Sequence, residues 1–262
     1  MVNPADEEPH RPRCAAPGER DRGQRARSFA YERPTSLAAA LERLRAEPES
    51  RVIAGGTDLI VRLRDGRARP PALVSLSRVE ELARIDVGDP VRIGAMARIA
   101  ALLESPALRA ALPSLAPACE TLGGAQVRNL ATVGGNLCNA SPCADTAPPL
   151  LTHGAMVRIA SASGVREVPL EDFFVSPGRT RLLEGELLVE LVVPRPAPGT
   201  RSTFLKKGRV RMDIAVASIA TLVVLEGARC TKVRIAAGSL GPRPMRLRAV
   251  ERAVEGRTLD EE

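Results

Sequence analysis

Residues 52–59 read VIAGGTDL, and residues 131–137 read ATVGGNL. Each stretch places two glycines after a short apolar run, with hydroxyl or amide side chains beside them. Glycine lets a phosphate oxygen approach the main chain because it has no Cβ, and a turn that opens a helix leaves backbone N–H groups unpaired. One such pair is usually only a tight turn. Two of them predict a diphosphate held from both sides.

Neither stretch matches the commonest nucleotide-binding motifs. The chain lacks G-x-G-x-x-G at both places, which argues against a Rossmann site, and it lacks the lysine of a P-loop. Asp145, nine residues beyond Asn136, has two interpretations that the sequence leaves open. Its carboxylate accepts hydrogen bonds from the ribityl or ribose hydroxyls of a dinucleotide, or it caps a helical turn over residues 146–151.

Three sets of residues resemble, in order and spacing, the FAD-binding medium subunit of the molybdenum hydroxylases. This family includes bacterial xanthine dehydrogenases, aerobic carbon monoxide dehydrogenases and 4-hydroxybenzoyl-CoA reductases. The sets are Ala54–Asp58; Gln126–Asn129 with Ala131–Leu137, Ser141-Pro142, Ala144-Asp145 and Pro148–Leu151; and Phe204–Arg209 with Met212–Ala215. The resemblance covers about residues 29–256.

The resemblance implies a bound FAD whose diphosphate lies between the two diglycine turns. It also implies an apolar contact with the flavin from Leu188, an FAD contact from Asp145, and a cation near the isoalloxazine from Lys206. Such a cation stabilises the anionic reduced flavin; the alternative for Lys206 is an exposed strand lysine. No residue is assigned a catalytic or metal-binding role. The predicted cofactor-binding residues are Ile53, Ala54, Gly55, Gly56, Thr57, Asp58, Thr132, Gly134, Gly135, Asn136, Asp145, Leu188 and Lys206.

The implied fold is α+β: a vanillyl-alcohol-oxidase (PCMH)-type FAD-binding domain of two subdomains, followed by a small α+β C-terminal domain. We place the FAD-binding domain at residues 29–197, with subdomains at about 29–85 and 86–197, and the C-terminal domain at 198–262. Because the chain ends at Glu262, we expect that last domain to be incomplete. Residues 1–28, rich in proline and charge, are expected to be a disordered extension.

Hydrophobic periodicity and turn residues predict the elements along the chain. Thr35 is expected to cap a helix with Leu37, Leu41 and Leu44 on one face. Residues 123–150, rich in Gly, Asn, Ser and Pro, are expected to form a binding loop, and residues 194–199 a linker. The other predicted helices are 59–64, 99–103, 113–121 and 247–254; the predicted strands are 51–54, 73–76, 84–87, 91–93, 155–160, 165–168, 187–193, 202–206, 214–225 and 231–236.

The resemblance also implies a role in electron transfer. Hydroxylation would take place at a molybdopterin site on a large partner subunit, and [2Fe–2S] clusters on a small partner would pass electrons to FAD here. The acceptor would be NAD, a quinone or oxygen. The sequence Asn-Ala-Ser-Pro at residues 139–142 slightly favours the xanthine-dehydrogenase-like branch. The lack of an inserted loop with four cysteines argues against the 4-hydroxybenzoyl-CoA reductase branch. Two alternatives stay open: a freestanding FAD-dependent oxidoreductase of the same fold, and a truncated, non-catalytic assembly subunit.

Composition excludes several other classes. The 262 residues are 44% hydrophobic and carry a net charge of +7, but the arginines are scattered and aromatic residues make up only 2%, so no nucleic-acid-binding platform is predicted. Five cysteines without a C-x-x-C pair, and two distant histidines, predict reduced thiols and no metal site. His153 is expected to be a partly exposed loop residue. No apolar run is long enough for a membrane span or a secretory signal, so we expect a cytoplasmic protein.

Overall fold

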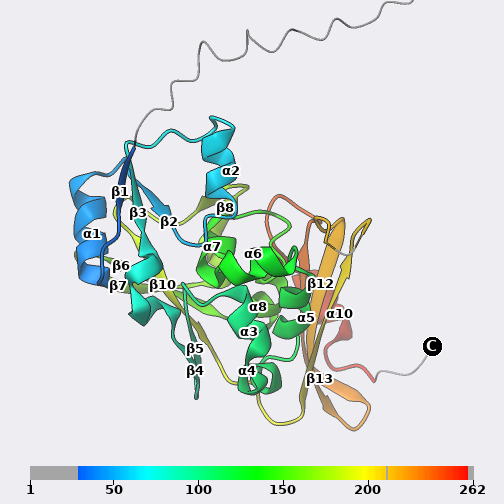
Figure 1. The fold of residues 1–262 in the computed structure, drawn as a ribbon. Helices are drawn as coiled ribbons and strands as arrows, with labels where there is room; N and C mark the ends of the chain where they lie inside the picture. Colours follow the sequence, from blue (N-terminus) through cyan, green and yellow to red (C-terminus); the bar gives the residue numbers. More distant parts are fainter. Residues whose placement is uncertain (1–28, 211, 259–262) are drawn as a thin grey trace, which may run out of the picture.

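The computed structural model describes residues 29–210 and 212–258. The expectation of disorder for residues 1–28 therefore lies outside the described residues. Three sheets of three or more strands organise the chain: a small parallel sheet, a larger antiparallel sheet, and a C-terminal antiparallel sheet, with most of the helices between the last two (Figure 1). None of the described helices has the length and apolar character needed to cross a membrane.

The first sheet is parallel, in the order β1-β3-β2, with bounds β1 (Ala30–Glu32), β3 (Ala72–Ser75) and β2 (Arg51–Ile53). Helix α1 (Leu37–Ala46) lies between β1 and β2 in the chain and buries Leu41 and Leu44 against Val74. Its cap is Ser36, one residue later than predicted, because the Ser36 side chain accepts a hydrogen bond from the Ala39 amide at 3.2 Å. Helix α2 (Leu59–Arg64), which follows β2, has the predicted bounds.

The second sheet is antiparallel, in the order β4-β5-β10-β6-β7. Its central strand, β10, follows the other four strands in the chain but lies between β5 and β6 in the sheet. Five of its seven residues are buried, as expected for a strand covered on both faces. A short helix, α9 (Leu170–Phe173), leads from β7 to the hairpin β8–β9. The bounds are β4 (Ile85–Val87), β5 (Val91–Gly94), β6 (Met156–Ser161), β7 (Gly164–Pro169), β8 (Phe174–Ser176), β9 (Arg179–Thr180) and β10 (Leu187–Val193).

The segment 123–150 is not the loop that its composition predicts. It contains α6 (Ala125–Leu130), α7 (Val133–Cys138) and the start of α8 (Ala147–His153). Gly134 lies buried within α7, and Thr132 caps that helix by accepting a hydrogen bond from the Gly135 amide. Burial and capping therefore overcome the low helix propensity of two adjacent glycines. Three more helices precede this segment: α3 (Ile99–Glu104), α4 (Pro106–Ala111) and α5 (Leu115–Thr121).

The C-terminal sheet follows the irregular segment 194–199, in the order β11-β12-β13-β14. One face contacts α5 and α8 of the preceding domain, and α10 (Arg248–Val254) covers β13 from the other side (Figure 1). A buried ion pair between Arg246 and Glu251, 2.6 Å apart, ties α10 to the sheet. The strand bounds are β11 (Thr200–Lys207), β12 (Ala217–Glu226), β13 (Arg229–Gly238) and β14 (Met245–Arg246).

His153 differs from its prediction as a partly exposed loop residue. It is the last residue of α8 and only 3% exposed, because α8 packs against β12 and β13. Its Nε2 lies 3.2 Å from the Ser114 Oγ. Burial, together with the positive charge of Arg234, lowers the pKa of His153 to about 4. The imidazole is therefore neutral in the folded protein at pH 7.

This lowered pKa predicts acid sensitivity. In the unfolded chain the His153 pKa returns to about 6.5, so between pH 6.5 and 4 the unfolded state binds a proton that the folded state does not. Stability should therefore fall as the pH drops through this window, by about 3 kcal/mol in total. Denaturant unfolding of the wild type and of His153→Gln across pH 4–8 measures this pH dependence of the free energy of unfolding. Parallel stability curves for the two proteins would contradict the assignment.

Candidate functional site

The two diglycine turns lie side by side. A Cβ built on Gly55 would fall 2.0 Å from the carbonyl oxygen of Leu130, at the end of α6. A Cβ built on Gly135 would lie 3.8 Å from the Cβ of Ala54. The first turn is thus packed against both the residues that precede the second turn and the second turn itself. Segments almost eighty residues apart in the chain form one continuous surface.

The structure gives the glycines a role that the sequence did not indicate. The Gly55 position admits no side chain because the Leu130 backbone occupies the space. Gly134 is similar: its Cβ would lie 2.6 Å from the Ala95 Cβ and 2.7 Å from the Ala95 carbonyl oxygen. Gly56 has a different reason for being glycine, a φ of +74°, which L side chains rarely adopt. Close packing against neighbouring backbone is therefore what Gly55 and Gly134 require, and a left-handed backbone conformation is what Gly56 requires.

The two turns differ in the hydrogen-bonding groups that they leave free. In the second turn, the Val133 amide donates to the carbonyl of Ala97 at 3.0 Å and the Gly134 amide to that of Ala95 at 2.9 Å. The Gly135 amide donates to the hydroxyl of Thr132, which caps α7. In the first turn the amides of residues 56–59 have no hydrogen-bond partner within the part of the chain that the structure describes. The first turn therefore offers donors for an anion, and the second offers mainly the Asn136 side chain.

Asp145 and Lys206 form a buried ion pair across the domain boundary. The Lys206 Nζ lies 2.8 Å from Asp145 Oδ2 and also donates to the carbonyl oxygen of Thr121 at 3.0 Å. Their side chains are only 5% and 7% exposed. The interpretation of Lys206 as an exposed lysine is therefore wrong. The capping interpretation of Asp145 is wrong too, because α8 begins after Thr146 and no side chain caps it.

One carboxylate oxygen of Asp145 has no partner. Burial raises the pKa of Asp145, while the hydrogen bond and the charge of Lys206 act against that shift. The oxygen Oδ1 is buried and accepts no hydrogen bond from any described residue. A buried acceptor without a donor is costly. Asp145 is therefore suited to accept a hydrogen bond from a bound group such as a hydroxyl of FAD.

The remaining predicted residues lie in the same region. Thr146, next to Asp145, donates from its hydroxyl to the Asn136 Oδ1 at 2.6 Å, which connects the second turn to the ion pair. Leu188 is buried on β10, at a bulge, and β10 contacts α7. Ile53 is buried at the end of β2 and contacts the position where a Gly56 Cβ would lie. All the predicted cofactor-binding residues therefore belong to one contiguous region.

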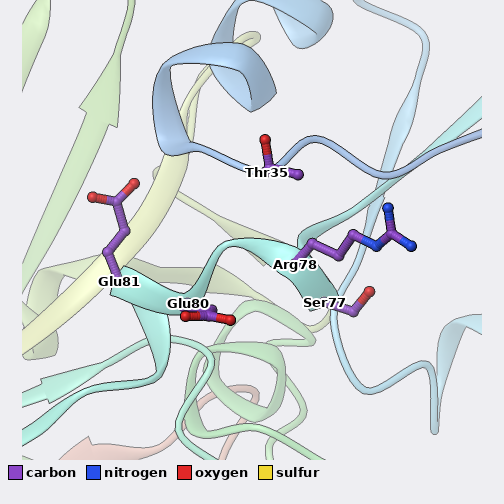
Figure 2. Close-up of a pocket in the computed structure, with 5 residues that line it drawn as sticks. All are labelled: Thr35, Ser77, Arg78, Glu80 and Glu81. Carbon is purple, nitrogen blue, oxygen red and sulfur yellow. The ribbon is translucent and has the colours of Figure 1, made fainter.

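One hollow borders this region, and a larger one lies at the first sheet. The smaller, about 290 Å³, is lined by residues of the C-terminal domain and one residue of α5: Thr121, Lys206, Lys207, Gly208, Arg209 and Val210. The larger, about 630 Å³, is lined by Thr35, Ser77, Arg78, Glu80 and Glu81 (Figure 2). Thr35 and Ser77 follow β1 and β3, so this hollow lies at the sheet edge from which the first diglycine turn also emerges. None of the predicted cofactor-binding residues lines it.

Two protein families match consecutive parts of the chain. Residues 27–196 match the family described as the FAD-binding domain in molybdopterin dehydrogenase, and residues 202–262 match the CO dehydrogenase flavoprotein C-terminal domain. The chain belongs to the FAD-binding medium subunits of the molybdenum hydroxylase family. This membership confirms the predicted family, the α+β fold and the FAD cofactor. It also confirms that the chain is a subunit of an oxidoreductase.

Individual relatives are similar over most of their length. A xanthine dehydrogenase FAD-binding subunit of Escherichia coli is 32% identical over 88% of this chain and 80% of its own. The glyceraldehyde dehydrogenase medium chain of Sulfolobus acidocaldarius is 33% identical over 89% and 83%. Among solved structures, carbon monoxide dehydrogenase from Hydrogenophaga pseudoflava superposes with a TM-score of 0.86 at 32% identity, covering 89% of this chain and 82% of that one.

Several residues at the site could not be found from the sequence. Thr121 takes part through its backbone carbonyl, and Ala95 and Ala97 through theirs, so their side chains carry no signal. Asn139 and Arg62 bond each other across 77 residues. Asn139 does lie in the Gly- and Asn-rich segment expected to be a binding loop, and in the stretch 139–142 that resembles the xanthine-dehydrogenase-like branch, but neither signal gives it a hydrogen-bonding role.

The packing of Gly55 predicts that even one methyl group is not tolerated there. Gly55→Ala would place a Cβ 2.0 Å from a backbone oxygen, so the two turns must separate, at a cost of at least about 2 kcal/mol. Gly88→Ala is the matched control, because its Cβ would meet nothing closer than 3.6 Å. Thermal unfolding without cofactor should show a lowered midpoint for Gly55→Ala and an unchanged one for Gly88→Ala. Equal midpoints would refute the packing role.

Proposed function

We propose that this chain binds FAD across its two diglycine turns and transfers electrons from the [2Fe–2S] clusters of a small partner subunit to an external acceptor. The observation that carries the proposal is the adjoining pair of turns with unpartnered amides at residues 56–59. Unpaired N–H groups converging on one surface are a general solution for binding a diphosphate. The proposal places the cofactor in residues 29–197 and its cationic neighbour, Lys206, in the domain that follows.

Each part of the site has a role in this proposal. The amides of the first turn and the Thr57 hydroxyl hold the diphosphate, and the second turn limits its position from the other side. The Asp145 Oδ1 accepts a hydrogen bond from a hydroxyl of the cofactor. Leu188 packs against it, and Lys206 places a positive charge near the flavin. When bound, the isoalloxazine supplies the capacity to accept and release electrons, and the protein supplies position and charge.

The proposed complex is xanthine-dehydrogenase-like, with an iron–sulfur small subunit and a molybdopterin large subunit. Support comes from the identity with the Escherichia coli subunit. Other relatives include a nicotinate dehydrogenase FAD-subunit and a caffeine dehydrogenase subunit, whose names indicate different organic substrates. We infer that the features these chains share serve electron transfer, and that the organic substrate is recognised in another subunit. NAD, a quinone and oxygen are the proposed acceptors.

Purification from the native host tests this proposal. We expect the chain to co-purify with iron–sulfur and molybdenum subunits and to show a flavin absorption spectrum, with FAD released on denaturation. A yellow chain that purifies without partners would indicate a freestanding oxidoreductase instead. A colourless chain that fails to bind added FAD would indicate an assembly subunit, and would overturn the proposal.

The charge of Lys206 predicts a change in flavin potential. Lys206→Met in the complex should lower the reduction potential by about 30 mV, equivalent to about 1.4 kcal/mol for a two-electron couple, because the cation favours the anionic reduced flavin. Lys207→Met removes an equal charge at the adjacent, exposed position and should leave the potential unchanged. The double variant Lys206→Met/Asp145→Asn removes both charges of the buried ion pair, so its potential should lie nearer to that of the wild type. A potential unaffected by losing Lys206 would remove its proposed role.

A further inference from the structure

Three side chains outside the diglycine pairs connect α2, the helix after the first pair, with α7, the helix that contains the second pair. Asn139, at the end of α7, accepts a hydrogen bond at its Oδ1 from Arg62 of α2, at 2.6 Å. Its Nδ2 donates to the Oδ1 of Asp58, at the start of α2, at 3.1 Å. The amide of Asn139 therefore uses both its donor and its acceptor to connect α7 with α2. We call Asp58, Arg62 and Asn139 the α2–α7 clasp.

Backbone hydrogen bonds link the clasp to both glycine pairs. The Asn139 N–H donates to the carbonyl of Gly135 at 3.0 Å. On the other side, Arg62 donates to the carbonyl of Asp58 at 3.1 Å, and Ile60 donates to that of Gly56 at 3.0 Å. Each member of the clasp thus lies within about two helical turns of a glycine pair. The clasp is therefore connected through backbone hydrogen bonds to both glycine pairs.

Helix α2 has little else to hold it in place. None of its residues is buried, and Ile60 and Val61 are 51% and 44% exposed. A surface helix is ordinarily fixed by an apolar face against the core. Among the described side chains, the hydrogen bonds between α2 and α7 are those of the clasp. Beyond the backbone packing of Gly55 against Leu130, the position of α2 and of the first turn's free amides therefore depends on these three polar residues.

We propose that Asp58, Arg62 and Asn139 are positioning residues that hold the first diglycine turn at the distance from the second that a diphosphate requires. This inference rests on the proposed binding of FAD, and it adds Arg62 and Asn139 to the residues on which the cofactor depends. Neither needs to contact FAD. The clasp acts on the diphosphate bridge, so it affects every ligand that contains this bridge and leaves the flavin ring contacts unchanged.

The test uses the full chain, freed of FAD, with FAD and ADP as probes of the diphosphate site. Asn139→Ala removes both hydrogen bonds and should weaken the affinities for FAD and ADP by the same factor, about tenfold. Arg62→Ala removes one hydrogen bond and should weaken both affinities about threefold. Arg248→Ala is the matched control, since Arg248 is also an exposed arginine bonded to a residue 77 positions away, Glu171. It should leave both affinities unchanged.

A charge-swapped pair separates positioning from general damage. Asn139→Asp alone places two carboxylates together and should weaken FAD strongly. In Asp58→Asn/Asn139→Asp the donor and acceptor exchange places, Arg62 gains a carboxylate partner, and FAD affinity should return to within about twofold of wild type. The unfolding midpoint of each cofactor-free variant should stay near wild type, because the clasp buries no apolar surface.

The outcomes distinguish the two proposals. Wild-type affinity for FAD in Asn139→Ala, or no recovery in the charge-swapped pair, overturns the clasp and leaves FAD binding by the chain intact. A weakened affinity for FAD with an unchanged affinity for ADP also overturns the clasp, since the effect would then lie at the flavin. Failure of the wild-type chain to bind FAD overturns the proposed function and the clasp together.

Discussion

The site depends on the close approach of backbone to backbone at two glycines. Gly55 packs against the carbonyl of Leu130, and Gly134 packs against Ala95, both at distances that exclude a Cβ. These contacts bring β2, α6, α7 and the turn after β5 into one cluster at the border between the parallel and antiparallel sheets. A diphosphate site between two turns can exist only if the turns can approach this closely. The glycines thus first assemble the site, before any ligand binds.

The assembled site is asymmetric. The second turn has its amides bonded to Ala95 and Ala97 and is built into the core, where Val133 and Leu137 are fully buried. The first turn has unpartnered amides and leads into α2, a helix without a buried residue. We infer that the second turn is the fixed side of the site and the first turn is the adjustable side. Beyond the packing of Gly55, order in the first turn and α2 has to come from polar contacts and from the ligand itself.

Much of this arrangement could be predicted from the sequence, for identifiable reasons. Alternation and turn residues located α2, β10 and the linker at 194–199 correctly, because these elements follow local rules. The helices in residues 123–150 were missed, since their glycines and prolines are tolerated only through burial and capping that the local sequence does not show. His153 was misjudged because the C-terminal sheet, not its own neighbours, covers it. Asn139 was missed because its partners lie 77 and 81 residues away.

The lysine of the ion pair with Asp145 belongs to β11, whereas both of its acceptors, Asp145 and the Thr121 carbonyl, belong to the preceding domain. The proposed dinucleotide site and the residue proposed to tune the flavin therefore come from two domains that pack against each other through α5 and α8. In the proposed site, cofactor retention therefore depends mainly on one domain and redox tuning on a residue of the other. Under this proposal, substitutions in the C-terminal sheet would adjust the driving force for electron flow without changing the two diglycine turns.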